Sequence, residues 1–136
     1  MAIRTPKLRE RDLQAFGEDL LILDRWRIFN PEQHFNERSR KLVGEAGAPD
    51  TLAIRYAYGG WPCHSEVLFI EWKSASGRLS TEQRLWHTRE RGLGAVTWIA
   101  KRMFDPTPEG FFAYYVSRGL MRRNMTMQDG RITVTR

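Results

Sequence analysis

Apolar residues return mostly every three to five positions over residues 8–21, the spacing that keeps them on one face of a helix. Thr5 and Pro6 suit the cap and the first turn of such a helix. The pattern therefore predicts a helix over residues 7–23. A short strand is expected at residues 26–29, where the sequence W-R-I-F is followed by the turn-forming pair N-P.

The middle of the chain combines one long polar stretch with two apolar runs. Residues 30–48 are polar and are expected to form a loop, with at most one helical turn. A loop of this length in a compact domain is often functional. The runs at 51–58 and 65–73 are typical of strands, and G-G-W-P at 59–62 is a turn signal between them. Because the connection is short, the two strands are predicted to pair as an antiparallel hairpin.

The second half of the chain begins with a helix-start signal. S-T-E-Q at 80–83 has the form of a capping box, which predicts a helix to about Arg91. A buried strand is expected at 95–100, and it should run parallel to the strand that precedes the helix. The aromatic run at 108–120 is assigned to a helix, although its residue types also suit a strand. Residues 132–135 are expected to form an edge strand.

This order of elements predicts an α/β fold in which a mixed β-sheet is flanked by helices. The chain has 136 residues, which is the length of one ordinary domain. We therefore treat residues 1–136 as a single domain with one hydrophobic core.

The positive net charge of the chain favours an anionic partner. The formal net charge is +6, and 18 of the 22 cationic residues are arginine. The planar guanidinium grips phosphate with two hydrogen bonds, which favours nucleic acid. A GC-rich genome would also enrich arginine, so the count alone leaves both explanations open. The candidate DNA contacts are Arg38, Arg40 and Lys41 in the long polar stretch, with Arg78, Arg84 and His87 further along.

The chain lacks the features of a secreted or membrane-spanning protein. Its single Cys63 cannot form an internal disulfide, and the polar N-terminus has no apolar signal core. No apolar run approaches the length of a transmembrane helix. These features predict a protein of the reducing cytoplasm without a membrane partner.

Charged residues interrupt the second strand of the expected hairpin. In F-I-E-W-K at 69–73, Glu71 and Lys73 share one face because strand side chains alternate. Hairpin pairing should bring Asp50, at the start of the first strand, close to Glu71. Two neighbouring carboxylates repel each other unless a cation lies between them, and Mg²⁺ prefers such oxygen ligands. The alternative is that Glu71 and Lys73 form an exposed ion pair on a solvated face.

The motifs around these residues resemble the virus-type replication-repair nuclease (VRR-NUC) branch of the PD-(D/E)xK nuclease superfamily. G-A-P-D at 47–50, E-W-K at 71–73 and G-R-L-S-T-E-Q at 77–83 match its pattern in order and spacing. E-R-D-L-Q at 10–14 looks like its opening helix. The likeness covers about residues 8–100, and the remaining third carries no matching motif.

The resemblance implies a restriction-endonuclease-like core and a DNA endonuclease that depends on Mg²⁺ or Mn²⁺. Asp50, Glu71 and the backbone carbonyl of Trp72 would hold the metal, and Lys73 would position the attacking water. Gln83 would support the site from the helix start, although it could serve the capping box alone. Glu10 would add an outer metal contact, although an acid in the first turn of a helix normally compensates the helix dipole.

The resemblance also implies a substrate and an assembly. Branched, junction or flap DNA is the expected substrate, cut by a homodimer in a bacterial or phage-infected cell. His87 lies one helical turn beyond Gln83 and is expected to be an exposed residue within reach of that substrate. The alternatives to this function are a non-catalytic DNA-binding module that keeps the nuclease fold, and a hydrolase acting on a small molecule.

Overall fold

The computed structural model describes residues 8–32, 34–56 and 65–135 of the chain. Their secondary structure confirms the mixed α/β class that the sequence predicts. In chain order the elements are α1 (Glu10–Leu23), β1 (Arg27–Phe29), β2 (His34–Asn36), β3 (Lys41–Val43), β4 (Thr51–Tyr56), β5 (Ser65–Glu71), α2 (Thr81–Gly92), β6 (Thr97–Ile99), α3 (Pro108–Ser117), β7 (Met125–Gln128) and β8 (Arg131–Val134).

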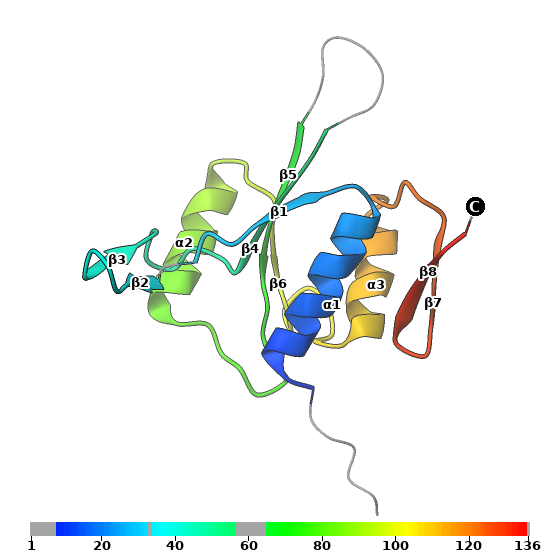
Figure 1. Cartoon of the computed structure of the whole chain (residues 1–136), viewed down its shortest axis with the longest axis horizontal. Coiled ribbons are helices and arrows are strands. Elements are labelled where there is room, and N and C mark those ends of the chain that lie inside the picture. The colour runs from blue at the N-terminus through cyan, green and yellow to red at the C-terminus, as the bar shows by residue number, and fades with distance from the viewer. Residues whose placement is uncertain (1–7, 33, 57–64, 136) are drawn as a thin grey trace, which may run out of the picture.

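A four-stranded sheet in the order β1-β4-β5-β6 forms the centre of the molecule. β4 pairs antiparallel with both β1 and β5, whereas β5 and β6 are parallel. The predicted hairpin and the predicted parallel pairing are therefore both confirmed. Figure 1 shows the sheet nearly edge-on, with α2 on one face and α1 and α3 on the other. The fold thus has three layers, helix, sheet and helix.

Strand β5 separates the two faces of the sheet by simple alternation of its side chains. Leu68, Ile70 and Trp72 are buried in the main core with residues of α1 and α3. Phe69 points to the other face, where its ring lies 5.0 Å from that of Trp86 in α2. Glu71, the next residue on the side of Phe69, therefore faces α2 rather than the main core.

Gly17 allows α1 to approach the sheet closely. A Cβ atom at this position would lie 2.0 Å from the indole of Trp72, a distance that no side chain can occupy. A glycine inside a helix normally weakens it. Here the glycine lowers the helix propensity of α1 but lets the indole of Trp72, just after the end of β5, pack directly against the helix.

One prediction about the irregular regions is wrong, and one strand was not predicted. Residues 34–43 form the β2–β3 hairpin instead of a loop, because the side chain of Asn36 accepts hydrogen bonds from the backbone N–H groups of Arg38 and Ser39. Strand β7 was not expected at all. It pairs with β8 through a turn at Asp129 and Gly130, which both have positive φ.

Other differences concern boundaries. The first helix begins at Glu10, and Thr5 and Pro6 lie outside the described residues. The run at 108–120 is a helix that ends at Ser117, so its strand alternative is wrong. The expected turn at 59–62 and Cys63 also lie outside the described residues.

A buried ion pair ties the layers together at the end of the sheet where β5 begins. Asp24 and Arg55 are almost completely buried, and their charged groups lie 3.0 Å apart. Asp24 also accepts hydrogen bonds from the hydroxyl of Tyr115 and from the backbone N–H groups of Arg122 and Arg123. This carboxylate therefore joins the end of α1 to β4, to α3 and to the segment that leads into β7.

Candidate active site

The candidate site lies where β4 begins and β5 ends. Thr51 pairs with Ile70 in the antiparallel register, so Asp50 and Glu71 are the next residues on neighbouring strands. In Figure 1, β4 begins and β5 ends toward the lower end of the sheet. The topology thus brings together two acids that are 21 positions apart in the sequence.

Hydrogen bonds fix Asp50 at the end of β5. Its carboxylate accepts from the backbone N–H of Trp72 at 2.9 Å, and its backbone carbonyl accepts from the side-chain amide of Asn30, also at 2.9 Å. The indole N–H of Trp72 donates to the hydroxyl of Thr51 at 2.8 Å. Trp72 therefore anchors both Asp50 and the residue that follows it.

The environment of Asp50 disfavours its charged form. Burial raises the pKa of this carboxyl to about 7, and the negative charge of Glu71 acts in the same direction. Glu10 and Glu32 raise the pKa further, while the hydrogen bond from the N–H of Trp72 lowers it. The site thus contains more negative charge than its own groups can neutralise.

Glu71 is fully buried, and its two carboxylate oxygens have different surroundings. Oε1 accepts a hydrogen bond of 2.5 Å from the amide nitrogen of Gln83 and lies 3.4 Å from Nζ of Lys73. Oε2 has no hydrogen-bond partner among the residues that the structure describes, and Nε2 of His87 is 3.9 Å away. The exposed ion pair that was the alternative for Glu71 and Lys73 is therefore wrong, since the Lys73 side chain is also only 11% exposed.

The first turn of α2 holds Gln83 against Glu71. Ser80 and Gln83 form the predicted capping box, in which the amide oxygen of Gln83 accepts from the Ser80 N–H at 2.9 Å. The amide nitrogen of the same side chain remains free for Glu71. Gln83 thus makes both of the contacts that the sequence presented as alternatives.

Gly47 explains why the P-D turn can lie so close to α2. It has a φ of +79°, and a Cβ there would lie 2.2 Å from the backbone carbonyl of Glu82. Only glycine fits this position. The G-A-P-D and S-T-E-Q motifs are therefore in direct contact, although Gly47 and Glu82 are 35 positions apart in the chain.

Glu10 lies within electrostatic reach of the same centre. Burial raises the pKa of Glu10, the charge of Lys73 lowers it, and the charge of Glu71 raises it. Glu10 is the first residue of α1, so it also meets the helix dipole in the ordinary way. The structure thus places Glu10 near the two acids and the lysine without a direct hydrogen bond between them.

The donor set can be compared with the needs of a divalent cation. Within residues 8–32, 34–56 and 65–135, no three side chains of His, Cys, Asp or Glu are arranged as a ligand group. Two repelling carboxylates and the unpartnered, buried Oε2 of Glu71 remain. Mg²⁺ commonly takes one or two carboxylates and completes its shell with water and substrate phosphate. Asp50 and Glu71 fit that requirement, and the carbonyl of Trp72 stays a prediction as a third ligand.

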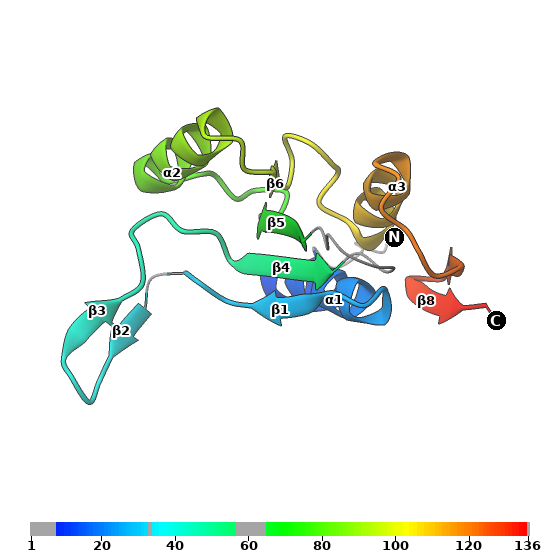
Figure 2. The same ribbon diagram turned by 90° about the horizontal axis from the view of Figure 1, so that it is seen from above.

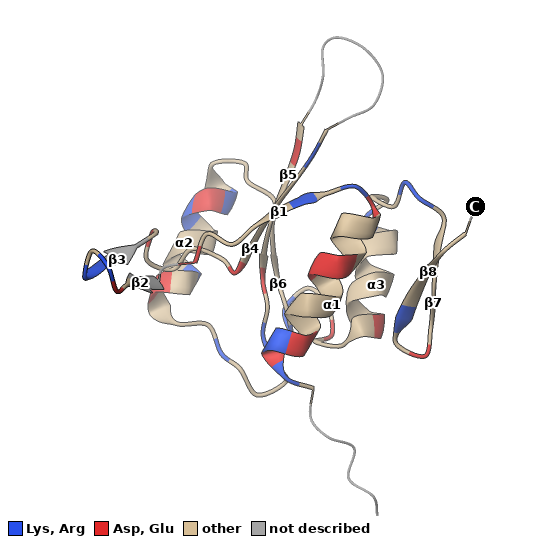
Figure 3. Ribbon diagram, viewed as in Figure 1, with Lys and Arg blue, Asp and Glu red and all other residues tan. Residues whose placement is uncertain are grey.

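The predicted DNA contacts fall into two groups. Arg78 and Arg84 are exposed and line a hollow beside Lys73. Arg38, Arg40 and Lys41 are exposed on the β2–β3 hairpin, which projects from the sheet beyond α2 (Figure 2) and carries basic positions, coloured blue, at its tip (Figure 3). The structure shows no contact between this hairpin group and the site, and their DNA-binding role stays a prediction.

Two features of the site were not anticipated. His87 was expected to be exposed, but only 2% of it is accessible to solvent. The reason is that it faces β5 from the same side of α2 as Gln83. The helical spacing of these two residues was a usable signal for this burial. Glu32, which adds negative charge near Asp50, carried no signal in the sequence.

Comparisons with protein-family models, curated proteins and solved structures find no match to this chain. None of the helices in the described residues is both long enough and apolar enough to cross a bilayer.

Proposed function

We propose that this chain is a metal-dependent DNA endonuclease with a restriction-endonuclease-like core, as its resemblance to the VRR-NUC branch implies. The observation that carries the proposal is the convergence of Asp50, Glu71 and Lys73 at one end of the sheet. The three residues come from a turn and a strand that are distant in the chain, yet the ammonium lies 3.4 Å from Glu71 and the Glu71 charge raises the Asp50 pKa.

Each residue has a role that follows from its surroundings. Asp50 and Glu71 would hold Mg²⁺ or Mn²⁺, which supplies charge neutralisation at the scissile phosphate and a more acidic bound water. Lys73 is almost buried and next to Glu71, so its ammonium can orient a water and offset charge that develops on the phosphate. Gln83 keeps the carboxylate of Glu71 in one orientation through its short hydrogen bond. Glu10 adds negative charge on the side of α1.

The substrate and the assembly extend the same proposal. The net charge of +6 suits a polyanion, and branched or flap DNA is the expected form. One chain offers one such centre, whereas cutting both strands of a junction takes two. We therefore propose a homodimer with two-fold symmetry, and sedimentation of the protein with and without DNA tests that part separately.

Cleavage of a labelled junction duplex tests the catalytic proposal. The wild-type protein should cleave with Mg²⁺ or Mn²⁺ and not with EDTA, and Asp50→Asn, Glu71→Gln and Lys73→Ala should each lose activity by at least about a hundredfold. Asp129→Asn is a matched control, since it makes the same chemical change in the exposed β7–β8 turn. Metal-dependent cleavage that survives the site substitutions would refute the assignment. DNA binding without any cleavage would favour the non-catalytic module instead.

A further inference from the structure

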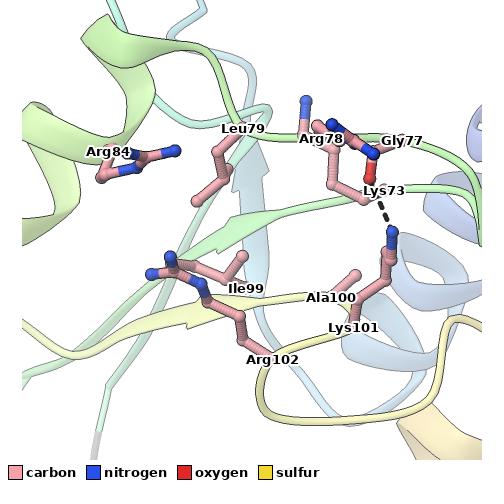
Figure 4. A pocket seen from close by; sticks show the side chains of 9 residues that line it. All are labelled: Lys73, Gly77, Arg78, Leu79, Arg84, Ile99, Ala100, Lys101 and Arg102. Carbon is pink, nitrogen blue, oxygen red and sulfur yellow. Dashed lines mark hydrogen bonds between the residues drawn. The ribbon is translucent and has the colours of Figure 1, made fainter.

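A hollow of about 260 Å³ lies next to the candidate active site, and cationic side chains dominate its lining. The loop between β5 and α2 forms one side of it, and the end of β6 with the residues that follow forms the other (Figure 4). Its lining residues are Lys73, Gly77, Arg78, Leu79, Arg84, Ile99, Ala100, Lys101 and Arg102. Five of these nine residues carry a positive charge and none carries a negative one, so the electrostatic potential of the hollow favours an anion.

The arginines of the hollow are available for a ligand. The guanidinium groups of Arg78, Arg84 and Arg102 form no hydrogen bond or ion pair with the other described residues, and all three residues are exposed. The side chain of Arg89 in α2, by contrast, is engaged with Glu45 and Glu90. Three unpaired guanidinium groups around one concavity repel each other, and a bound anion would relieve this repulsion.

The two sides of the hollow are held at a fixed separation. Nζ of Lys101 donates a hydrogen bond of 2.8 Å to the backbone carbonyl of Gly77, as the dashed line in Figure 4 shows. The backbone N–H of Lys101 donates to the carbonyl of Phe104, which closes the turn after β6. Lys101 therefore connects the two loops that line the hollow.

The floor and the size of the hollow narrow the ligand class. Leu79, Ile99 and Ala100 provide an apolar floor beneath the charged rim. The volume lies below the range of about 300–1,000 Å³ that is usual for sites of drug-sized ligands. A phosphate group with part of an attached sugar suits such a site, because the sugar can rest on the apolar floor while the guanidinium groups bind the oxygens.

The position of Lys73 connects the hollow to the reaction. This lysine lines the hollow and also contacts Glu71. We propose that the hollow binds a phosphate of the DNA strand adjacent to the phosphate that reacts, with Arg84 and Arg102 as its main ligands. This inference rests on the proposed function and adds the segment after β6 to the DNA-binding surface. A second fixed phosphate would hold the strand in register with the metal ligands.

Salt-dependent DNA binding tests the proposal independently of catalysis. Fluorescence anisotropy of a labelled nicked duplex in EDTA, over a range of KCl concentrations, compares wild type with Arg84→Gln/Arg102→Gln. The slope of log Kd against log salt should fall by about one unit in the double variant, the value expected for one lost phosphate contact. Binding at low salt should weaken by about tenfold. Arg131→Gln, which removes an exposed charge on β8, is the matched control and should leave the slope unchanged.

A loss in the single-charge control of half the loss in the double variant, or more, would overturn the proposal, because each cation would then act only as part of a general positive surface. An unchanged slope in the double variant would overturn it as well. Thermal unfolding of each variant excludes misfolding, which is not expected since both arginines are exposed and their guanidinium groups form no hydrogen bond or ion pair with the described residues. Failure of the wild type to cleave DNA would refute the catalytic function alone, whereas the anisotropy measurement needs no metal and no cleavage.

The same duplex distinguishes the two sources of the phosphate. One version carries a phosphate at the 5′ end of the nick and the other carries a hydroxyl. If the hollow takes a terminal phosphate, wild type prefers the phosphorylated version and the double variant loses this preference. If it takes an internal phosphodiester, both versions bind equally well to wild type and lose affinity equally in the double variant. Both results support the phosphate site and differ only in its place along the strand.

Discussion

Removing the negative charge of Asp50 should make the metal-free protein more stable at neutral and alkaline pH. Burial and the charge of Glu71 raise the pKa of Asp50 from its ordinary value of 3.8 to about 7 in the folded state. The folded protein therefore binds this proton more tightly than the unfolded chain does. The resulting stabilisation is fully present below pH 3.8 and is lost as the pH rises through about 7.

The size of the effect follows from the pKa difference. Each pKa unit corresponds to about 1.4 kcal/mol, so the ionisation of Asp50 lowers the free energy of unfolding by at most about 4 kcal/mol between acid and neutral pH. Water around the exposed part of the side chain reduces this value, and we expect about 2–4 kcal/mol. In Asp50→Asn the side chain cannot ionise but still offers an oxygen to the N–H of Trp72. The free energy of unfolding of this variant should therefore not fall in this way as the pH rises.

Urea denaturation in EDTA, followed by tryptophan fluorescence, measures the effect at a series of pH values from about 4 to about 8.5. Wild type and Asp50→Asn should have similar stability at the acid end, and the variant should be more stable at the alkaline end. Other acids titrate in both proteins, so the informative quantity is the difference between the two curves. Parallel curves would refute the reasoning. At alkaline pH, Mn²⁺ should stabilise wild type more than the variant, because binding to the folded state alone adds to its stability.

Five further substitutions test the architecture by urea denaturation. Gly17→Ala should cost about 1–3 kcal/mol because its Cβ collides with the neighbouring indole, whereas Gly92→Ala, with no atom within 4 Å, should be neutral or slightly stabilising. Ser80→Ala and Gln83→Ala should each cost about 1 kcal/mol through the helix cap, but only the second should also lower cleavage activity. Asp24→Ala should cost about 3–5 kcal/mol because it leaves a buried guanidinium without its closest buried partner.

The last of these substitutions has its own control. Glu66 contacts the same Arg55 guanidinium at 2.6 Å, but it is about one-third exposed. Glu66→Ala should therefore cost about 1 kcal/mol or less, as is usual for an ion pair in contact with water. Equal losses for Asp24→Ala and Glu66→Ala would contradict the view that burial makes Asp24 the main partner of the network.

The regular part of the fold could be predicted from local patterns. Helical spacing, the capping box at Ser80 and the alternation along β5 depend on residues close in the chain, and the structure confirms all three. The β2–β3 hairpin was missed because short polar strands give little periodic signal, and its register depends on the turn at Asn36. The β7–β8 hairpin could have been found from D-G at 129–130, which is a strong turn signal.

The placement of the two acids could be predicted from the sequence, but the burial of the site could not. Strand alternation and hairpin pairing placed Asp50 near Glu71 from the sequence alone, and the register is consistent with that placement. Burial of Glu71 and His87 could not be derived in the same way, because it depends on how closely α2 lies against the sheet. That approach is set by Gly47, which meets the backbone of α2 from a segment more than thirty residues away.

The hydrophobic core and the candidate site are physically linked through one residue. The indole of Trp72 fills the space that Gly17 leaves open, on the face of the sheet opposite to Glu71. The backbone N–H of the same residue holds the carboxylate of Asp50, and its indole N–H holds Thr51. Since the core fixes the rotamer of Trp72, it also fixes the end of β5 on which both acids depend. Two repelling carboxylates would otherwise be free to separate, and a rigid strand end keeps them together.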